Sequence, residues 1–307
     1  MKKNARLKAY KEHWPLYLMM VPGLLYLLIN NYIPMAGIVI AFKKLNFAEG
    51  ILRSPWAGLE NFKFLFATKD AWLITRNTLL YNVAFIIVNM VVGIAIAILI
   101  CEVRNTKMKK LYQSAILLPF LMSMVILSYI VYALLSSENG LINNSILAAL
   151  HLDPVQWYQE PKYWPFILIF ANCWKGVGYG CLIYIASLIG IDPSFYEAAR
   201  LDGATKWQEI TRITLPCLVP TIVTLLLLSI GRIFYSDFGL FYQVPMNSGV
   251  LFPTTNVIDT YVYRALIERG NISMSSAAGV YQSLVGFAIV MFSNQVVRRI
   301  DKEQALF

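Results

Sequence analysis

Long apolar stretches separated by short polar segments dominate the pattern of this sequence. Six of them approach the length of about 20 residues that crosses a hydrocarbon layer, and they lie at residues 16–40, 77–100, 111–135, 165–190, 217–238 and 276–297. A backbone in lipid must satisfy its hydrogen bonds within the segment, so these stretches are predicted to be helices. The alternation typical of barrel strands is absent from the pattern. We therefore expect an all-α integral membrane protein with six transmembrane helices.

The composition supports lipid as the main solvent of the chain. Of its 307 residues, 58% are apolar and 14% are charged, values that exclude an ordinary soluble domain. The net charge of +9 comes from cations at the ends of the apolar stretches, where topology and anionic lipid account for them. A nucleic-acid partner is therefore not expected. The four cysteines match no metal or redox motif, and no disulfide framework is expected; they are Cys101, Cys173, Cys181 and Cys217.

Lysine and arginine residues, which are retained on the cytoplasmic side during insertion, predict the orientation. If both termini are cytoplasmic, the inner segments carry fifteen of these residues and the longer outer segments carry nine. This orientation is the expected one, although the first outer loop departs from the rule with six cations: Lys43, Lys44, Arg53, Lys63, Lys69 and Arg76.

We expect three parts along the chain. Residues 1–75 form an N-terminal anchor helix and the first extracytoplasmic loop, because the first apolar stretch is too long for a signal sequence and lacks a cleavage site. Residues 76–297 form the transmembrane domain, and residues 298–307 form a cytoplasmic tail. The transmembrane domain includes a polar loop at residues 191–216.

This loop, between the fourth and fifth apolar stretches, carries the signals of a short helix. Asp192 followed by Pro193 predicts an N-cap with proline at the first helical position. Gly203 predicts a left-handed residue that ends the helix. Such a helix is too short to be stable alone in water, so we expect it to pack on another protein.

A second helix is predicted directly after the first. Thr205 and Gln208 have the spacing of a capping box. Pro216 is expected to close this helix at the membrane.

The same loop matches the signature E-A-A-x3-G-x9-I-x-L-P at all its specified positions, which are Glu197, Ala198, Ala199, Gly203, Ile213, Leu215 and Pro216. By this motif the chain resembles membrane subunits of binding-protein-dependent ATP-binding-cassette importers with the type I permease fold, over residues 70–300. The resemblance implies that the short helix lies in a groove of an ATPase subunit. The coupling residues that it implies are Tyr196, Glu197, Ala198, Ala199, Asp202 and Gly203. The alternative is an ordinary loop helix that packs on its own spans.

The resemblance also implies partners. The sequence contains no Gly-Lys-Ser/Thr string of a P-loop, so ATP and Mg are expected on a separate ATP-binding subunit, and this chain is expected to bind no cofactor and to be no enzyme. In the family two homologous permeases, expected here to be a heterodimer, attach two ATP-binding subunits and receive substrate from an extracellular solute-binding protein. The implied location is the bacterial cytoplasmic membrane.

Two weaker strings favour a carbohydrate as the cargo. Residues 174–179 and 257–264 resemble strings in the oligosaccharide and polysaccharide branch of these permeases. The alternative cargoes are peptides, amino acids and phosphate. An ion-coupled secondary carrier would need acidic residues inside the spans, where only Asp237 comes close. The absence of catalytic strings disfavours an intramembrane enzyme.

Polar side chains inside the spans predict a substrate path, because burying them in lipid is costly. On the fourth span polar residues share one helical face, and on the fifth span Ser229, Arg232 and Ser236 share another. Aromatic rings on these faces could stack on sugars, and the two cations would favour acidic sugars. The predicted path residues are Asn172, Trp174, Lys175, Tyr179, Arg232, Tyr235 and Asp237. The alternative is that Lys175 and Arg232 pair with the partner permease and only stabilise the bundle.

Glycine and proline residues predict two special places in the spans. Gly176, Gly178 and Gly180 predict either a loosened helix or close helix packing. Pro119 could bend the third span. Packing accounts for both and is the preferred interpretation.

Overall fold

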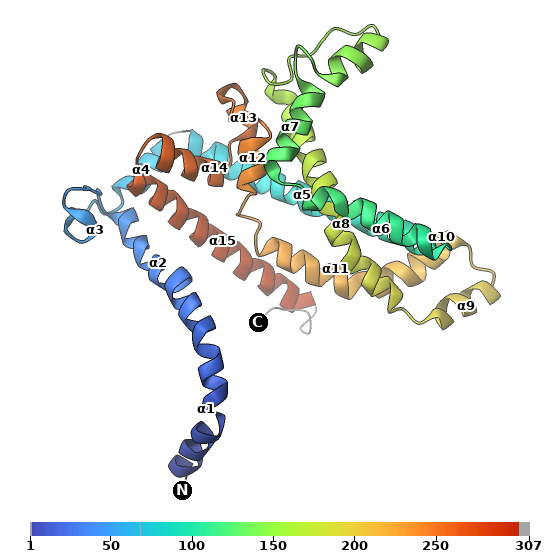
Figure 1. Ribbon diagram of the computed structural model, residues 1–307, viewed down its shortest axis with the longest axis horizontal. Coiled ribbons are helices and arrows are strands. Elements are labelled where there is room, and N and C mark those ends of the chain that lie inside the picture. The colour runs from blue at the N-terminus through green and yellow to red at the C-terminus, as the bar shows by residue number, and fades with distance from the viewer. Residues whose placement is uncertain (1, 68, 301–307) are drawn as a thin grey trace. The chain divides into compact units, whose positions relative to one another are not determined.

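The computed structural model describes residues 2–67 and 69–300, and most of this length is helical (Figure 1). These residues contain no strand, and one isolated antiparallel bridge joins Lys43 and Trp56. Five helical segments are long and apolar enough to cross a membrane, or six if one bent pair counts as a crossing. The expected all-α architecture is therefore confirmed. The cytoplasmic location of both termini stays a prediction.

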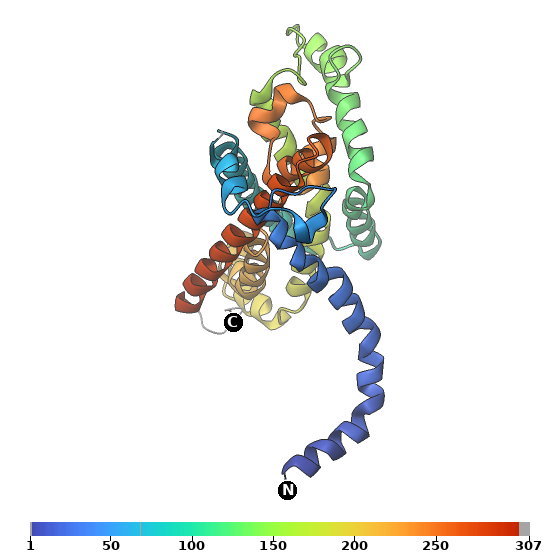
Figure 2. The same ribbon diagram turned by 90° about the vertical axis from the view of Figure 1, so that its left-hand side faces the viewer.

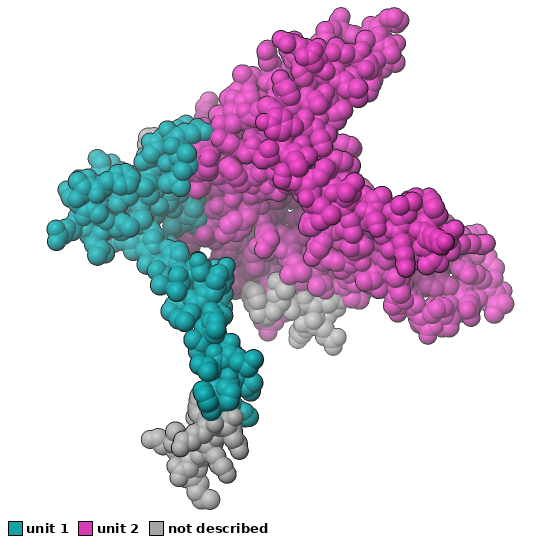
Figure 3. Space-filling view, viewed as in Figure 1, with its two compact units in different colours: residues 1–68, 265–280 teal, residues 69–264, 281–307 magenta. Residues whose placement is uncertain are grey.

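The chain divides into two compact units (Figure 3). Unit 1 consists of residues 1–68 and 265–280, and unit 2 consists of residues 69–264 and 281–307. The boundary expected at residue 75 falls inside a long helix that begins at Asp70. Of the expected tail, residues 301–307 lie outside the described residues.

Unit 1 begins with a helical run that reaches Phe42 (Figure 2). The run consists of α1 (Lys2–Leu27), a π-helical turn (Leu28–Tyr32), α2 (Ile33–Met35) and a 3-10 segment (Ala36–Phe42). Most of its large apolar side chains between Trp14 and Val39 are exposed, as expected for a helix that faces lipid. Two short helices follow, α3 (Gly50–Arg53) and α4 (Glu60–Ala67), and the unit also holds the first turns of α15 (Ile272–Ile300).

Unit 2 is built on a close pair of long helices, α5 (Asp70–Glu102) and α8 (Trp164–Ile189). Small residues at their contact allow the approach, since a Cβ at Gly93 would lie 3.3 Å from the ring of Tyr184. Gly178 of α8 packs against α6 (Thr106–Leu121) so closely that a Cβ there would lie 2.1 Å from the carbonyl oxygen of Ile116. The packing interpretation is confirmed for Gly178, whereas no such contact is found at Gly180.

The third predicted span, 111–135, is not one straight helix. α6 ends at Leu121, α7 (Met124–Leu135) begins three residues later, and the two axes differ by 96° (Figure 1). Pro119 lies in the last turn of α6, where it donates no backbone hydrogen bond. Ser123 then starts a new helix, because its hydroxyl accepts a hydrogen bond from the amide of Ile126 at 3.2 Å. The bend that Pro119 predicted in the third span is therefore confirmed, and it divides the predicted span into two helices.

The fifth predicted span, 217–238, is also shifted. The observed helical run covers residues 206–230 and consists of α10 (Lys206–Glu209), a π-helical turn (Ile210–Thr214) and α11 (Leu215–Ile230). Pro216 lies in the first turn of α11 and does not close a helix, because the wider π turn precedes it. After Ile230 the chain leaves the α-helix for residues 231–237, so the helical face proposed for Arg232 and Ser236 does not exist.

Short elements cover the ends of α5 and α8 in unit 2. They are a 3-10 turn (Pro161–Tyr163), α12 (Phe238–Gln243), α13 (Phe252–Thr255) and α14 (Ile258–Tyr263). A π-helical turn (Ile142–Leu147) follows α7, a 3-10 turn (Gly249–Leu251) precedes α13, and a π turn at Arg264–Glu268 leads along the chain from unit 2 into unit 1. Polar side chains of α5 fix this cover, since the Tyr81 hydroxyl donates to the carbonyl of Thr254 at 2.8 Å and Thr78 accepts from the amide of Ile258 at 3.1 Å.

Candidate functional site

The loop at residues 191–216 contains the predicted short helix, α9 (Pro193–Leu201). The Asp192 carboxylate accepts a hydrogen bond from the amide of Ser194 at 2.9 Å, and this bond holds the pKa of Asp192 below its ordinary value. At the other end Gly203 has a φ of 77°, a left-handed conformation that glycine adopts without strain. The predicted start and end of the helix are confirmed.

A capping box begins the next helix, as predicted. The Thr205 hydroxyl accepts from the amide of Gln208 at 3.4 Å, and the Gln208 side chain accepts from the amide of Thr205 at 2.7 Å. Two adjacent helices with their own caps therefore form this loop.

The apolar side chains of the loop face away from the rest of unit 2. Leu201 is 89% exposed, Trp207 is 73% exposed and Phe195 is 56% exposed, and Figure 1 shows α9 standing apart from the long helices. Of the predicted coupling residues, four are exposed and Ala199 is partly buried; the exposed ones are Glu197, Ala198, Asp202 and Gly203. Exposed anchors on a short helix are typical of a docking surface.

Tyr196, the remaining predicted coupling residue, faces inward. Its hydroxyl lies 3.0 Å from the hydroxyl of Thr214, in the π turn before α11. Tyr196 thus links α9 to the helix that enters the membrane. Thr214 is buried and has no place in the sequence motif.

A buried carboxylate that sequence reasoning missed joins the two helices of the loop. Glu209 is 3% exposed, and its carboxylate lies 2.8 Å from Arg200 Nε and 3.0 Å from Lys206 Nζ. Lys206 also lies 3.1 Å from a carboxylate oxygen of Glu102, at the end of α5. Three helices are connected through these charges. Lys206 and Glu209 have the i,i+3 spacing by which their pair could have been predicted. The pairs with Arg200 and Glu102 join different helices, and no periodicity predicts them.

A second candidate site is a cavity of about 610 Å³ inside unit 2, between α5, α8, α11 and residues 231–237. Five of the seven predicted path residues line it: Asn172, Tyr179, Arg232, Tyr235 and Asp237. The cavity brings together the polar residues of two segments, although the second segment is not the predicted helical face. Its volume lies within the range of small-molecule sites.

Asparagines of α5 complete the lining of this cavity. Asn82 and Asn89 both line it, and the Asn89 amide donates to the Asn172 side chain at 2.8 Å. The Asn89 side-chain oxygen and the Ser236 hydroxyl are buried and have no hydrogen-bond partner among the described residues. Asn82 and Asn89 are polar, seven residues apart in an apolar span, a signal by which the sequence could have identified them.

Lys175 and Trp174 do not line the cavity. Lys175 Nζ donates to the backbone carbonyl of Phe120 at 3.0 Å and lies 5.4 Å from the centre of the Phe120 ring. The ring of Tyr179 also stacks on the ring of Phe120, with 5.1 Å between the ring centres. The charge of Lys175 is therefore used within this chain, where it binds a backbone carbonyl and an aromatic ring at the end of α6.

The non-helical wall of the cavity is held from behind by Asp259 and Gln282. Asp259 accepts from the amide of Ser236 at 2.7 Å and from the Gln282 side chain at 3.1 Å. Gln282 also donates to the carbonyl of Phe234 at 2.9 Å. Burial raises the pKa of Asp259, while these two hydrogen bonds act in the opposite direction. The backbone groups that the chain exposes on leaving the helix are thus satisfied.

Comparison with known proteins identifies the family to which the chain is similar. Residues 74–302 match the family described as binding-protein-dependent transport system inner membrane component. The chain is 34% identical to the polygalacturonan/rhamnogalacturonan transport system permease protein YteP of Bacillus subtilis (strain 168), with 98% of this chain and 93% of YteP covered. It is 32% identical to protein LplB of the same organism, with 95% and 91% covered.

Two crystal structures resemble the chain along almost its whole length. One is a bacterial ABC transporter involved in the import of the acidic polysaccharide alginate, with a TM-score of 0.88, 34% identity and coverage of 96% of this chain and 99% of that chain. The other is a bacterial alginate ABC transporter in complex with an alginate pentasaccharide-bound periplasmic protein, with a TM-score of 0.86, 34% identity and coverage of 95% and 97%.

Proposed function

Because the chain belongs to the family of binding-protein-dependent transport system inner membrane components, we propose that it forms part of the membrane path of an ATP-driven importer for acidic oligosaccharides or polysaccharide fragments. The chain is a permease subunit and not an enzyme, and hydrolysis of ATP belongs to a separate subunit. The chain crosses the bacterial plasma membrane several times, with both of its termini in the cytoplasm.

The observation that carries the proposal is the geometry of α9. A nine-residue helix with Phe195 and Leu201 exposed gains stability by docking on another protein. We assign its exposed face to an ATP-binding subunit, with Glu197, Ala198 and the Asp202–Gly203 end in the contact. Tyr196 supports this surface from inside through Thr214.

The cavity of unit 2 supports a sugar as the cargo. Its side-chain amides bind hydroxyl groups, the rings of Tyr179 and Tyr235 offer faces for stacking, and Arg232 offers a guanidinium to a carboxylate. One similar protein is named for the transport of polygalacturonan/rhamnogalacturonan, and one similar structure is of a transporter involved in the import of the acidic polysaccharide alginate. Arg232 is the lining residue that we assign to the acidic group, with Asn172 and Asp237 as partners of hydroxyls.

The proposed partners are those that the resemblance to the family implies. A second, homologous permease completes the path as a heterodimer, two ATP-binding subunits with ATP and Mg attach on the inner side, and an extracellular solute-binding protein delivers the cargo, as a periplasmic protein does in the alginate complex. Binding of ATP draws α9 and the corresponding helix of the second permease together, so that the cavity opens to the outside. Hydrolysis of ATP then opens the cavity to the inside.

Uptake by reconstituted vesicles tests the proposal. The complex is purified from its native membrane through a tag on this chain, its subunits are identified by mass spectrometry, and it is reconstituted with its copurified solute-binding protein. Trigalacturonate, an acidic trisaccharide, is expected to enter only when ATP and the binding protein are both present.

Two controls define failure. Uptake driven by an ion gradient without ATP would contradict the importer mechanism. ATP-driven uptake of a tripeptide, with none of trigalacturonate or of neutral maltotriose, would contradict the sugar cargo while leaving the importer mechanism in place.

A further inference from the structure

We propose that a cavity within unit 1 is a second binding site for acidic sugars, on the outer side of the membrane. The cavity has a volume of about 530 Å³ and lies between the loop after the first helical run and the turn that begins α15. This volume is typical of small-molecule sites. The acidic-sugar class rests on the proposed function, whereas the site itself rests on the residues below.

Chain order predicts that the segments that form this cavity lie outside the cell. If residues 191–216 contact an ATPase inside the cell, α11 leads outward and α15 begins outside. The amide of Leu45 donates to the Ser273 hydroxyl at 3.0 Å, so the loop after the first helical run meets the start of α15. Both walls of the cavity therefore face the outside, where cargo arrives.

The walls are rigid although they contain little regular structure. Lys43 is buried, its Nζ donates to the carbonyls of Ile51 and Leu52 at 3.0 and 2.7 Å, and it lies 5.1 Å from the centre of the Trp56 ring. The Asn61 amide donates to the carbonyl of Lys43 at 3.0 Å. A loop fixed in this way loses little conformational entropy when a ligand binds.

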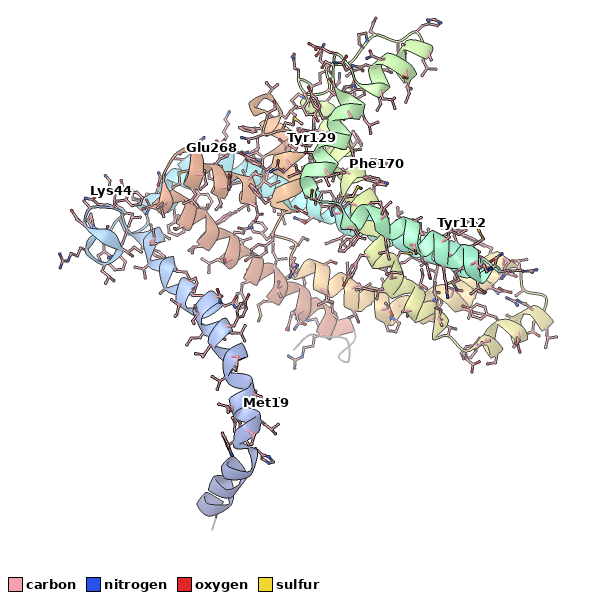
Figure 4. All side chains as sticks on the ribbon, viewed as in Figure 1. Met19, Lys44, Tyr112, Tyr129, Phe170 and Glu268 are labelled. Atoms are coloured by element: carbon pink, nitrogen blue, oxygen red, sulfur yellow. The ribbon has the colours of Figure 1, made fainter. Side chains whose placement is uncertain are left out.

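Three charged side chains in the cavity have no ion-pair partner among the described residues. Lys44, Glu60 and Arg269 line the cavity, and no described side chain forms an ion pair with any of them. Figure 4 labels Lys44 on the loop. Two cations against one carboxylate favour an anionic ligand, and carboxylates bind to lysine and arginine through charge-assisted hydrogen bonds.

This arrangement also accounts for part of the unusual charge of the first outer loop. Cations in this loop oppose the bias that retains lysine and arginine inside the cell. Lys43 uses its charge to fix the loop, whereas the Lys44 side chain forms no ion pair with any described residue. A ligand that carries carboxylates gives Lys44 and Arg269 a function.

The other lining groups fit a sugar. Phe47 is 75% exposed at the cavity and offers a ring face to the apolar side of a pyranose. The Ser273 oxygen accepts from Leu45, which leaves its hydroxyl proton free to bind a sugar oxygen. Glu60 accepts hydrogen bonds from sugar hydroxyls. An acidic peptide would use the cations but not this combination of ring and hydroxyl partners.

Binding of trigalacturonate to the full-length chain in lipid nanodiscs, without the solute-binding protein, tests the site. The measurements use the Arg232→Gln background, which removes the cation of the unit 2 cavity. Lys44→Gln and Arg269→Gln are each expected to weaken binding about tenfold, as the loss of one charge-assisted hydrogen bond does. The matched control is Lys63→Gln, which removes an exposed cation of the same loop outside the cavity and is expected to bind as the background does.

Each outcome decides the proposal. Unchanged binding in the double variant Lys44→Gln, Arg269→Gln would overturn it, and so would equally tight binding of a triaspartate peptide, which would indicate a contact for an acidic protein loop. ATP-driven uptake by the wild-type complex without binding at this cavity would overturn this inference and leave the proposed function intact. Binding here without any ATP-driven sugar uptake would support the site and contradict the proposed function.

Discussion

Arg200 and Glu209 form an ion pair of 2.8 Å that ties the last turn of α9 to the helix that enters the membrane. Through Lys206, the same carboxylate is connected to Glu102 at the end of α5. The helix that we assign to ATPase contact is therefore attached to two long helices by side chains as well as by the chain itself. Displacement of α9 can therefore reach both helices through this network, in addition to the contact between Tyr196 and Thr214.

Replacement of Glu209 by glutamine should separate ATP hydrolysis from transport. The neutral amide would leave the charges of Arg200 and Lys206 without their buried partner, so α9 would be held less firmly to the helices behind it. We expect the complex to assemble and hydrolyse ATP, while the number of sugars imported per ATP falls about tenfold. Vesicles with both activities measured on one preparation provide the ratio.

The matched control for this change is Glu102→Gln, at an exposed carboxylate of the same network, whose loss should have a much smaller effect because solvent screens it. A second control exchanges the charges in the double variant Arg200→Glu, Glu209→Arg, which should recover part of the ratio. An unchanged ratio in Glu209→Gln would show that the network plays no part in coupling.

The N-cap of α9 gives a second prediction. Asp192→Ala removes the acceptor for the amide of Ser194 and should fray the start of the helix. We expect severalfold weaker binding of the ATPase subunit, measured by the fraction retained when this chain is pulled down through a tag. Asp192→Asn, which keeps the acceptor, should retain nearly all of it. Equal retention in both variants would contradict the role of the cap.

Gly178 predicts a strong effect on stability. An alanine there would place its Cβ 2.1 Å from the carbonyl oxygen of Ile116, so α6 and α8 would have to separate. Overpacking of this kind costs about 1–3 kcal/mol, which should lower the melting temperature of the purified chain in detergent by several degrees. Gly180→Ala, two residues away with no atom within 4 Å of the new Cβ, should melt like the wild type; an equal loss in both would contradict the close contact.

The two cations of the predicted path should behave differently. Arg232→Met should raise the KM for trigalacturonate about tenfold, because the guanidinium lines the cavity, and should affect a neutral sugar less. Lys175→Met should leave both KM values nearly unchanged, since its ammonium binds the carbonyl of Phe120, and should instead lower the yield of folded chain. The kinetics of uptake, measured for both cargoes, separate these cases, and the reverse pattern would reject the assignment of Arg232.

Local signals in the sequence predicted the elements that local chemistry determines. Asp192, Gly203 and the Thr205–Gln208 pair each act within a few residues, and all form the predicted caps. The apolar stretches likewise predicted long helices, because a backbone in lipid must form its hydrogen bonds within the segment.

Features that depend on distant contacts were missed. Ile230 is the last residue of its helix, and the chain after it is held by Asp259 and Gln282, which lie far along the sequence. The Lys175 side chain points to the end of α6, where it binds the carbonyl of Phe120. The position of this end could not be predicted, because it lies within an apolar stretch. Helical periodicity alone could not reveal either contact.

The residues that anchor the segment 231–237 determine the shape of the unit 2 cavity, whereas other residues form its lining. Asp259 and Gln282 fix the backbone at Ser236 and Phe234, yet neither of them lines the cavity. A substitution at either position can shift that wall while every cargo-facing side chain stays the same. Substitutions outside the lining can thus change the width of the passage during evolution. Two relatives with identical lining residues need not admit the same polymer.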